Sequence, residues 1–388
     1  MPGPVFLHRL FYVLQLGSMA ALLPLLGGRF EAAGFDGLTI GGLMATFPLG
    51  RLLAAPFWAV LADRYRVAGL VLRLSAVLSG VAGMALARSE SIPALAVAIF
   101  VFAATRAPIG SVLDALVLGR LAELGRPTAE YGRIRLWGSL GFLAGVLLAS
   151  NWVATGLPPH LLADATLAAA AVVSFGFPLR GAGGPAPIMP ALRELAASPF
   201  LVPLLVTGAL QALTMSVYDT FFSVHVAALG LPEGVVGASV ALGVGCEVLL
   251  MSFGRPFLLR VGPARGLLLA ALSGIPRWLV TATVSDPVVL VAIQALHGFG
   301  FALFWLSGVH RMAQAARPEI AASSQSLWAA ATYGFGALVG AGLAGFARRE
   351  LGSDGIFWML AFVSLLATVS AVWLWRVDRA HFAGGPAR

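Results

Sequence analysis

The sequence predicts an all-α membrane protein with twelve transmembrane helices in two pseudo-symmetric six-helix bundles. Hydrophobic residues make up 59% of the 388 residues and charged residues only 11%, which is not the composition of a soluble globular chain. Apolar runs of about 20 residues, long enough to cross a bilayer, recur along the whole chain. Short motifs of the first half return about 190 to 200 residues later, as in a duplicated bundle.

Each half of the chain contains six apolar runs of spanning length. The first six predicted spans lie at residues 6–28, 38–62, 67–87, 92–118, 134–156 and 160–178. The second six lie at residues 200–228, 235–254, 264–284, 287–309, 323–346 and 355–375. Pro56-Phe57, at the end of the second run, returns as Pro256-Phe257 in the second half. The pattern predicts an N-terminal bundle over 1–179, a cytoplasmic linker over 180–199 and a C-terminal bundle over 200–388.

The arginines predict that both termini are cytoplasmic. All 25 basic residues are arginine. With the N-terminus inside, sixteen of them fall on the cytoplasmic side and four outside, which is the bias that sets topology. The formal charge of +8 therefore belongs to loops between spans and does not indicate nucleic acid. We expect a multi-pass protein of a bacterial inner membrane.

Several functional classes lack their signatures here. The lone Cys246 excludes an internal disulfide and a cysteine metal cluster. The sequence has no His-Glu-x-x-His, no nucleophile elbow and no phosphate loop. We therefore expect no enzyme, no cofactor and no metal. The expected partners are the lipid bilayer, protons and a small-molecule substrate, and we expect a monomer.

Five arginines fall at membrane depth, where each costs roughly 2.5 to 3.5 kcal/mol at a helix centre. They are Arg51, Arg73, Arg106, Arg135 and Arg277. Possible partners inside spans are Asp114, Asp219, Glu247, His225 and His297. Structural ion pairs would hold the helices in register, whereas functional ones would bind substrate or protons in a central cavity. Without Arg73, four arginines face three acids. We hypothesise that the extra charge meets an anionic substrate, a carboxylate, with Arg106 as its ligand.

Glu247 and His297 suggest a proton relay in the second half. Small residues flank Glu247, so another helix can approach it closely. His297 titrates near neutral pH without any perturbation, and Arg277 adds a basic group on a third span. A hydrogen-bonded packing role for His297 remains the alternative.

Glycines in two spans are spaced to line up on one helix face. They are Gly138, Gly141 and Gly145 in the fifth span and Gly336 and Gly340 in the eleventh. Such faces predict close helix contact.

Several motifs resemble a known transporter family. The loop Ala59-Val-Leu-Ala-Asp63-Arg64-Tyr-Arg66 resembles Gly-x-x-x-Asp-Arg/Lys-x-Gly-Arg, found between helices two and three of the major facilitator superfamily, with Ala59 for the first glycine and the second glycine missing. Further motifs resemble the lactose permease and phenylpropionate permease-like (MFS_1-like) group of proton symporters. They are Tyr131-Gly-Arg133-Ile-Arg135-Leu-Trp-Gly138-Ser-Leu-Gly141-Phe142, Tyr218-Asp219, Glu247, Arg277-Trp278 and Leu296-His297-Gly298.

This resemblance implies alternating access between two six-helix halves. Asp114 and Arg135 match the acid and the arginine that hold substrate in the lactose permease, and Phe142 stands where its sugar-stacking Trp belongs. The matches to the proton-coupling network are Glu247, Arg277 and His297, with Asp219 matching an acid of helix seven. Gly300 replaces a protonatable Glu and Gln294 a Lys. Galactoside transport is therefore disfavoured, and aromatic acids fit better.

The sequence thus predicts a secondary active transporter, a proton symporter of a small organic solute such as an aromatic carboxylate. The predicted substrate-binding residues are Asp114, Arg135, Arg106, Phe142 and Tyr218. The predicted proton-coupling residues are Glu247, Arg277, His297 and Asp219. The predicted gating residues are Asp63, Arg64, Arg66 and Arg133. Alternatives are a proton-driven exporter of amphipathic compounds, a sugar or nucleoside symporter and, in another class, a membrane sensor.

Overall fold

The computed structural model describes residues 5–35, 37–126, 130–154, 160–179, 188–232 and 234–382. Within them the regular structure is entirely helical. Eight described helices are long and apolar enough to cross a membrane, and two shorter apolar helices cover Phe6–Leu22 and Leu161–Ser174. The predicted all-α membrane fold is confirmed. Residues 180–187 of the predicted linker lie outside the described residues.

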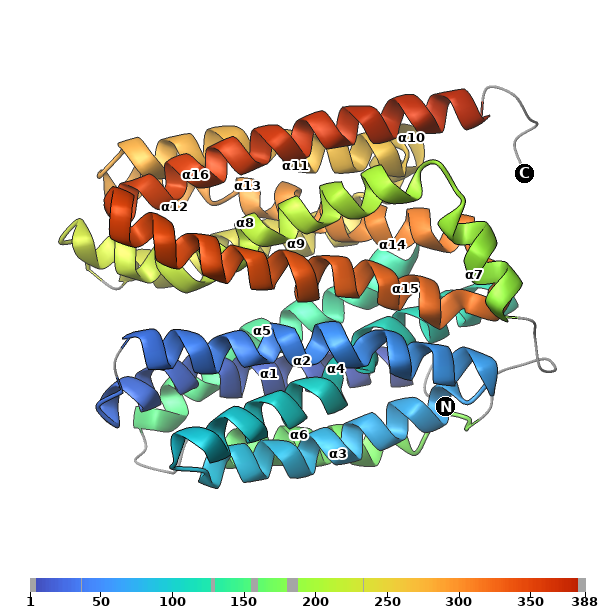
Figure 1. Cartoon of the computed structure of the whole chain (residues 1–388), viewed down its shortest axis with the longest axis horizontal. Helices are drawn as coiled ribbons and strands as arrows, with labels where there is room; N and C mark the ends of the chain where they lie inside the picture. Colours follow the sequence, from blue (N-terminus) through green and yellow to red (C-terminus); the bar gives the residue numbers. More distant parts are fainter. Residues whose placement is uncertain are drawn as a thin grey trace. The chain divides into compact units, whose positions relative to one another are not determined.

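Helices α1 to α6 form the first half. Their bounds are α1 Phe6–Ala32, α2 Gly37–Arg64, α3 Ala68–Arg88, α4 Ile92–Glu123, α5 Tyr131–Ala154 and α6 His160–Ser174. The short helix α7 follows at Ile188–Ala196. Each of the first six predicted spans therefore lies on a helix (Figure 1).

The second half is more irregular. Its first helices are α8 Leu201–Ala228, α9 Gly234–Phe253, α10 Arg255–Val261, α11 Pro263–Thr283, α12 Pro287–Ile293 and α13 Leu296–Gly298. After them come a π-helix Phe299–Leu303, α14 Phe304–Ala315, a 3₁₀ turn Pro318–Ile320, α15 Ala321–Ala329, a π-helix Ala330–Gly336 and α16 Ala337–Phe382. Gly352, with φ +74°, interrupts α16 and divides it into the last two predicted spans.

The tenth predicted span lies on Pro287–Ala315, a helical segment long enough to cross a membrane, which is irregular near its middle. Gln294 and Ala295 form a turn between α12 and α13. There His297 N–H donates to the Gln294 carbonyl, three residues back, at 2.9 Å. Such tightening, followed by a π-helix, often marks a functional segment of a helix. The sequence predicted one continuous helix here because apolar residues continue through the turn.

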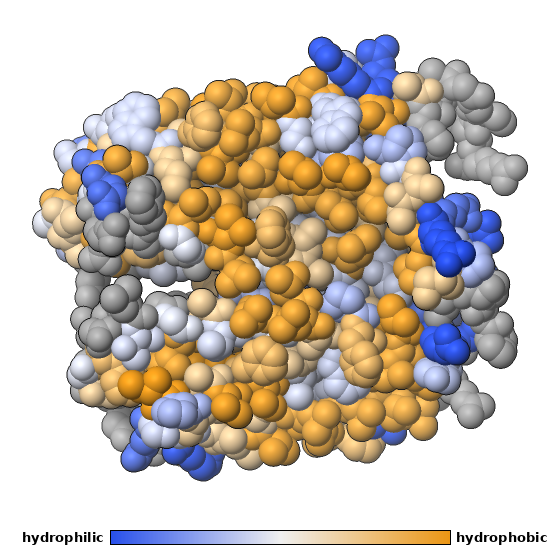
Figure 2. Space-filling view, viewed as in Figure 1, coloured by the Kyte–Doolittle hydropathy of each residue, from blue (hydrophilic) through white to orange (hydrophobic). Residues whose placement is uncertain are grey.

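Contacts between residues divide the chain into two compact units. The N-terminal unit comprises Met1–Ile188 and Ala316–Ala330, and the C-terminal unit comprises Met189–Ala315 and Ala331–Arg388. The second segment of the N-terminal unit contains α15, which packs on α2 and α4. Within each unit, apolar side chains cover the middle of the helices in the face shown in Figure 2, with charged ones near helix ends.

Helix packing in each unit relies on close backbone approach. A Cβ added at Gly141 of α5 would lie 2.4 Å from the Val13 carbonyl oxygen of α1, and one at Gly336 would lie 2.4 Å from the Ala209 carbonyl oxygen of α8. The glycine faces predicted in the fifth and eleventh spans therefore do contact neighbouring helices. Dispersion contacts of this kind hold helices together where lipid removes the hydrophobic driving force.

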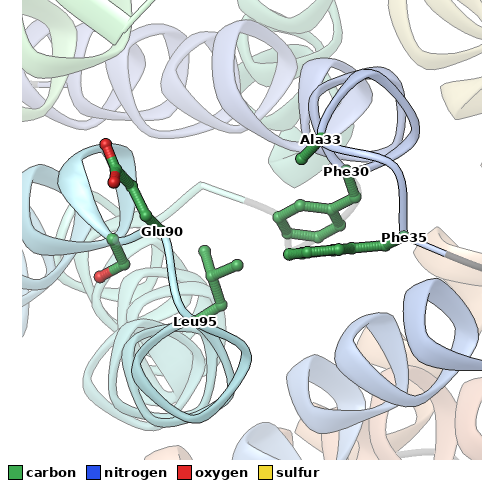
Figure 3. A pocket seen from close by; sticks show the side chains of 6 residues that line it. Phe30, Ala33, Phe35, Glu90 and Leu95 are labelled. Atoms are coloured by element: carbon green, nitrogen blue, oxygen red, sulfur yellow. The ribbon is translucent and has the colours of Figure 1, made fainter.

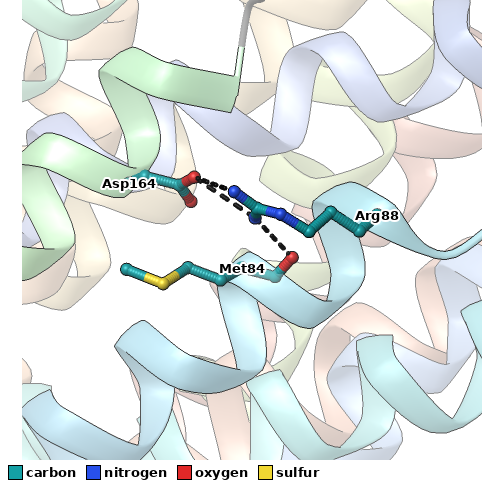
Figure 4. A network of polar contacts seen from close by, with 3 residues as sticks. All are labelled: Met84, Arg88 and Asp164. Carbon is teal, nitrogen blue, oxygen red and sulfur yellow. Dashed lines mark hydrogen bonds and ion pairs between the residues drawn. The ribbon is translucent and has the colours of Figure 1, made fainter.

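An ion pair joins α3 and α6 near the end of the N-terminal unit (Figure 4). The Arg88 guanidinium lies 3.3 Å from Oδ2 of Asp164 and also donates to the Met84 carbonyl oxygen at 2.8 Å. Because Arg88 is 56% exposed in its side chain, this pair contributes little stability.

Candidate solute and proton sites

A buried acid in the N-terminal unit binds two tyrosines. Asp114 on α4 is 2% exposed. The Tyr131 hydroxyl of α5 donates to its Oδ1 at 2.8 Å, and the Tyr12 hydroxyl of α1 donates to the same oxygen. Arg135 lies with its guanidinium carbon 5.6 Å from the centroid of the Tyr12 ring. The structure thus gathers the predicted pair, Asp114 and Arg135, in one cluster, and adds two tyrosines.

Arg106 lies two turns before Asp114 on α4, and its hydrogen-bond partners are neutral. It is 7% exposed. Its Nη1 donates to Oγ of Ser18 at 3.1 Å, and its Nη2 donates to the Gln15 carbonyl oxygen. Arg51 acts on it as a second positive charge. None of these contacts neutralises the guanidinium. A negatively charged group next to it would therefore be favourable.

The side-chain amide of Gln15 is left over at the same place. Gln15 is 3% exposed, and neither its Oε1 nor its Nε2 has a hydrogen-bond partner among the described residues. Leaving a buried amide unpaired costs about 1 to 3 kcal/mol, so such a group calls for an explanation. A ligand that also contacts Arg106 would supply its partner. Phe142, the predicted stacking residue, is half-buried on α5.

The C-terminal unit brings together the residues predicted to carry protons. Oε2 of Glu247, on α9, lies 3.8 Å from Nε2 of His297, on α13. The His297 ring stacks on Phe301 with centroids 5.7 Å apart and lies 6.3 Å from the ring of Tyr218. Glu247 is 4% exposed. The buried acid and the half-buried imidazole therefore form a pair.

Arg277 reaches this pair through Tyr218. Its guanidinium carbon is 4.3 Å from the centroid of Tyr218 and 4.2 Å from that of Trp278. Its Nε donates to Oε1 of Gln294 at 2.8 Å. In the sequence Gln294 is notable only because it stands where the resemblance places a lysine. In the structure its side chain accepts a hydrogen bond from Arg277. The more exposed Asp219, next to Tyr218 on α8, acts on Arg277 electrostatically.

Gly300 lies close to this group. A Cβ added there would meet the Met215 Cε at 3.0 Å and the Ser273 Oγ at 3.4 Å. A longer side chain at this position would displace these groups. The protonatable residue that the resemblance places here would therefore require the Met215 side chain to move.

The predicted gating residues are only partly brought together. Asp63, at the end of α2, accepts hydrogen bonds from the backbone N–H groups of Ala322 and Ser323 at 3.1 and 2.6 Å. A carboxylate in this position caps the first turn of α15 and interacts favourably with its helix dipole. Arg64 and Arg133 are exposed, and Arg66 is half-buried with φ +53°.

A cavity in the N-terminal unit lies away from these residues. It measures about 330 Å³ and is lined by Phe30, Ala33, Phe35, Ser89, Glu90 and Leu95. Figure 3 shows the rings of Phe30 and Phe35 beside each other, with the Glu90 carboxylate directed away from them. Among the described residues, no cluster of three His, Cys, Asp or Glu could hold a metal ion.

Comparison with known proteins identifies similar chains. The family model described as "MFS_1 like family" matches residues 7–360. A maltose permease of Geobacillus stearothermophilus is 31% identical over 284 residues, covering 72% of this chain and 70% of that protein. A protein of Escherichia coli strain K12, described as "Probable 3-phenylpropionic acid transporter", is 26% identical over 367 residues, covering 92% of this chain and 94% of that one.

Two solved structures share the fold at low identity. A bacterial homologue of the iron transporter ferroportin in an outward-facing state matches with a TM-score of 0.75 and 15% identity, over 96% of this chain and 99% of that one. The nucleoside transporter NupG matches with a TM-score of 0.69 and 17% identity, over 96% and 99%. Both matches extend over nearly the whole chain.

Proposed function

The chain belongs to the MFS_1 like family of transporters, and from that membership we propose that it is a proton symporter of a small aromatic carboxylate. It is a multi-pass membrane protein and a secondary transporter of a small solute. The members of its superfamily are transporters rather than enzymes. The proposed location is the inner membrane of a bacterium, with both termini cytoplasmic.

The pair formed by Arg106 and Gln15 carries the substrate proposal. Arg106 is a buried cation whose hydrogen-bond partners are neutral. A carboxylate would accept charge-assisted hydrogen bonds from its guanidinium, and the free amide of Gln15 would bind the second carboxylate oxygen. The description of the Escherichia coli relative as a "Probable 3-phenylpropionic acid transporter" supports this choice.

The proton proposal rests on the buried contact between Glu247 and His297. A proton on either group changes the net charge of the pair next to Tyr218 and Arg277. A net charge on the Glu247–His297 pair is costly inside the membrane. Binding of a proton would therefore favour a different packing of α9 against α13. Substrate and proton would then be linked through the same conformational change.

Uptake into proteoliposomes tests the proposal. With a pH gradient imposed, acid outside, radiolabelled 3-phenylpropionate is expected to accumulate above the level in protein-free liposomes, which measure passive entry of the neutral acid. Glu247→Gln should take up no more solute than the protein-free liposomes do under the same pH gradient. Accumulation by Glu247→Gln that equals wild type would show that the proton is carried elsewhere.

Maltose is the second candidate solute, because the most identical relative named above is a maltose permease. Maltose uptake is measured in the same vesicles. Passive entry of this polar sugar is negligible. Accumulation of maltose, with none of 3-phenylpropionate above the protein-free level, would replace the aromatic acid by a sugar. Resistance of wild-type cells to amphipathic drugs, lost on deletion, would instead favour the exporter.

A further inference from the structure

A continuous series of contacts links an exposed acid to the buried Arg277. Asp354, whose side chain is 60% exposed, lies just after Gly352 in α16, with its Oδ1 3.5 Å from Nδ1 of His225, near the end of α8. Nε2 of His225 lies 2.9 Å from the carbonyl oxygen of Thr281 in α11. His225 and Thr281 are both buried. Helices α8 and α11 each pack along α16 (Figure 1).

The series continues from Thr281 to the arginine. Nε2 of Gln294 donates to Oγ1 of Thr281 at 3.4 Å, and Oε1 of Gln294 accepts from Nε of Arg277 at 2.8 Å. Oγ1 of Thr281 also donates to the carbonyl oxygen of Arg277 at 2.8 Å. Thr281 and Gln294 are wholly buried. Both the backbone and the side chain of Arg277 are therefore held by residues that connect to His225.

The carbonyl of Thr281 fixes the tautomer of His225. A carbonyl oxygen only accepts, so Nε2 must carry the hydrogen. In the neutral ring Nδ1 is then a bare acceptor that faces a carboxylate oxygen, and no described residue donates to it. In the protonated ring Nδ1–H donates to Asp354 in a charge-assisted bond. Among the described residues Asp354 is the charged group that acts on this ring, while the ring of Phe357 packs on it with centroids 4.6 Å apart.

We propose that His225 is a positioning residue for Arg277, and that a proton shared with Asp354 tightens its hold when the compartment at this end of the C-terminal unit becomes acidic. The predicted topology places that end outside the cell. The inference rests on the proposed proton-coupling role of Arg277. Acidification from outside would thereby pin α11 between α8 and α16 before the proton reaches Glu247.

Cys246 provides a readout that needs no substrate. It precedes Glu247 on α9, and a Cβ added at Gly298 of α13 would lie 2.6 Å from its Cβ. A Cβ at Gly243 would lie 3.3 Å from the Gln294 carbonyl oxygen. The thiol therefore lies where α9 packs on the turn that begins at Gln294. Opening of this contact is expected to raise the rate of its alkylation.

The experiment compares alkylation of Cys246 by N-ethylmaleimide in the full chain in proteoliposomes, at about pH 7.5 and about pH 4.5. The lower value is set well below the ordinary imidazole titration because His225 is buried. The rate of each variant is divided by the wild-type rate at the same pH, which removes the effect of thiol ionisation. For Asp354→Ala this ratio is expected to be near one at the higher pH and to rise up to about fivefold at the lower pH, as one partly exposed ion pair is lost. A ratio equal at both values would overturn the proposal.

Two further variants separate positioning from simple loss of structure. In Asp354→Asn the new amide can donate to the unprotonated Nδ1 of His225 at either pH. The alkylation rate of this variant, divided by the wild-type rate, should therefore be below one at the higher pH, where the wild type lacks this bond, and near one at the lower pH. Asp164→Asn, which removes the exposed pair of Figure 4 in the other unit, should give a ratio near one at both. A pH effect of the same size in Asp164→Asn would also overturn the proposal. Failure of solute uptake by the wild type would reject the proposed function and leave this comparison intact.

Discussion

Among the described residues of the N-terminal unit, one buried arginine has no acid among its hydrogen-bond partners, and the side-chain amide beside it has no hydrogen-bond partner. Arg106 donates to Ser18 and to the backbone of Gln15, while the Gln15 side chain remains unpaired among the described residues. Asp114 differs, because two tyrosine hydroxyls already satisfy one of its oxygens. Of these two buried charges, Arg106 therefore has the greater capacity to bind a solute.

Arg106→Ala is expected to weaken binding of 3-phenylpropionate about ten- to a hundredfold, because a hydrogen bond to a charged group contributes about 1.5 to 3 kcal/mol. Binding is measured by scintillation proximity with the purified protein. Arg88→Ala removes an exposed arginine at the end of the same unit and should leave the affinity unchanged. Equal affinities of Arg106→Ala and wild type would remove the guanidinium from the solute site.

At the scale of helices, the two units depend on contacts that side chains larger than glycine would prevent. The α1–α5 pair comes together over Gly17, Gly141 and Gly145, where added Cβ atoms would meet backbone at 2.4 to 3.1 Å. Backbone cannot move aside as a flexible side chain can. Such contacts are consistent with helices that pack closely throughout the transport cycle.

Gly141→Ala is expected to lower the free energy of unfolding by about 1 to 3 kcal/mol, the usual cost of overpacking. The measurement is thermal unfolding in detergent, followed by a dye that reacts with Cys246 as it becomes exposed. Gly237→Ala on α9 is the matched control, since nothing lies within 4 Å of its added Cβ. A melting temperature lowered equally in both variants would show that the α1–α5 contact is not the cause.

Asp63 acts on the helix α15 rather than on a single residue. Asp63→Ala removes the negative charge of the carboxylate and both hydrogen bonds that it accepts from the first turn of α15. This change is expected to destabilise that turn by about 1 to 2 kcal/mol. Hydrogen exchange of residues 321–325 measures the effect. Asp63→Asn keeps one acceptor without the charge, so faster exchange than in Asp63→Ala would contradict the capping role.

At the scale of the whole molecule, the arginine bias predicts the direction of insertion. A fluorescent protein fused after Arg388 should fold and fluoresce, because it would remain in the cytoplasm, whereas alkaline phosphatase at the same position should be inactive. The reverse pair of results would invert the topology. It would also place Asp354 and His225 on the cytoplasmic side, so the compartment sensed by that pair would change while the pair itself would not.

The class of the protein, its spanning segments and its family follow from patterns along the chain. Spanning helices are local, since about 20 apolar residues satisfy their own backbone groups in lipid whatever surrounds them. The motif around Asp63 and the residues Glu247, Arg277 and His297 could be read from the chain alone. The identity of the substrate could not, because one arginine recognises many carboxylates.

Only the tertiary structure decided which charges meet. Tyr12 and Gln15 look like ordinary members of apolar runs, and Gln294 is notable in the sequence only as the replacement of a lysine. Their importance follows from neighbours 17 to 102 residues away in the sequence, such as Asp114 for Tyr12. The turn at Gln294 and the capping of α15 by Asp63 also depend on contacts between helices. A side chain's hydrogen bonds are set by the packing of separate helices, and no pattern along one helix specifies that packing.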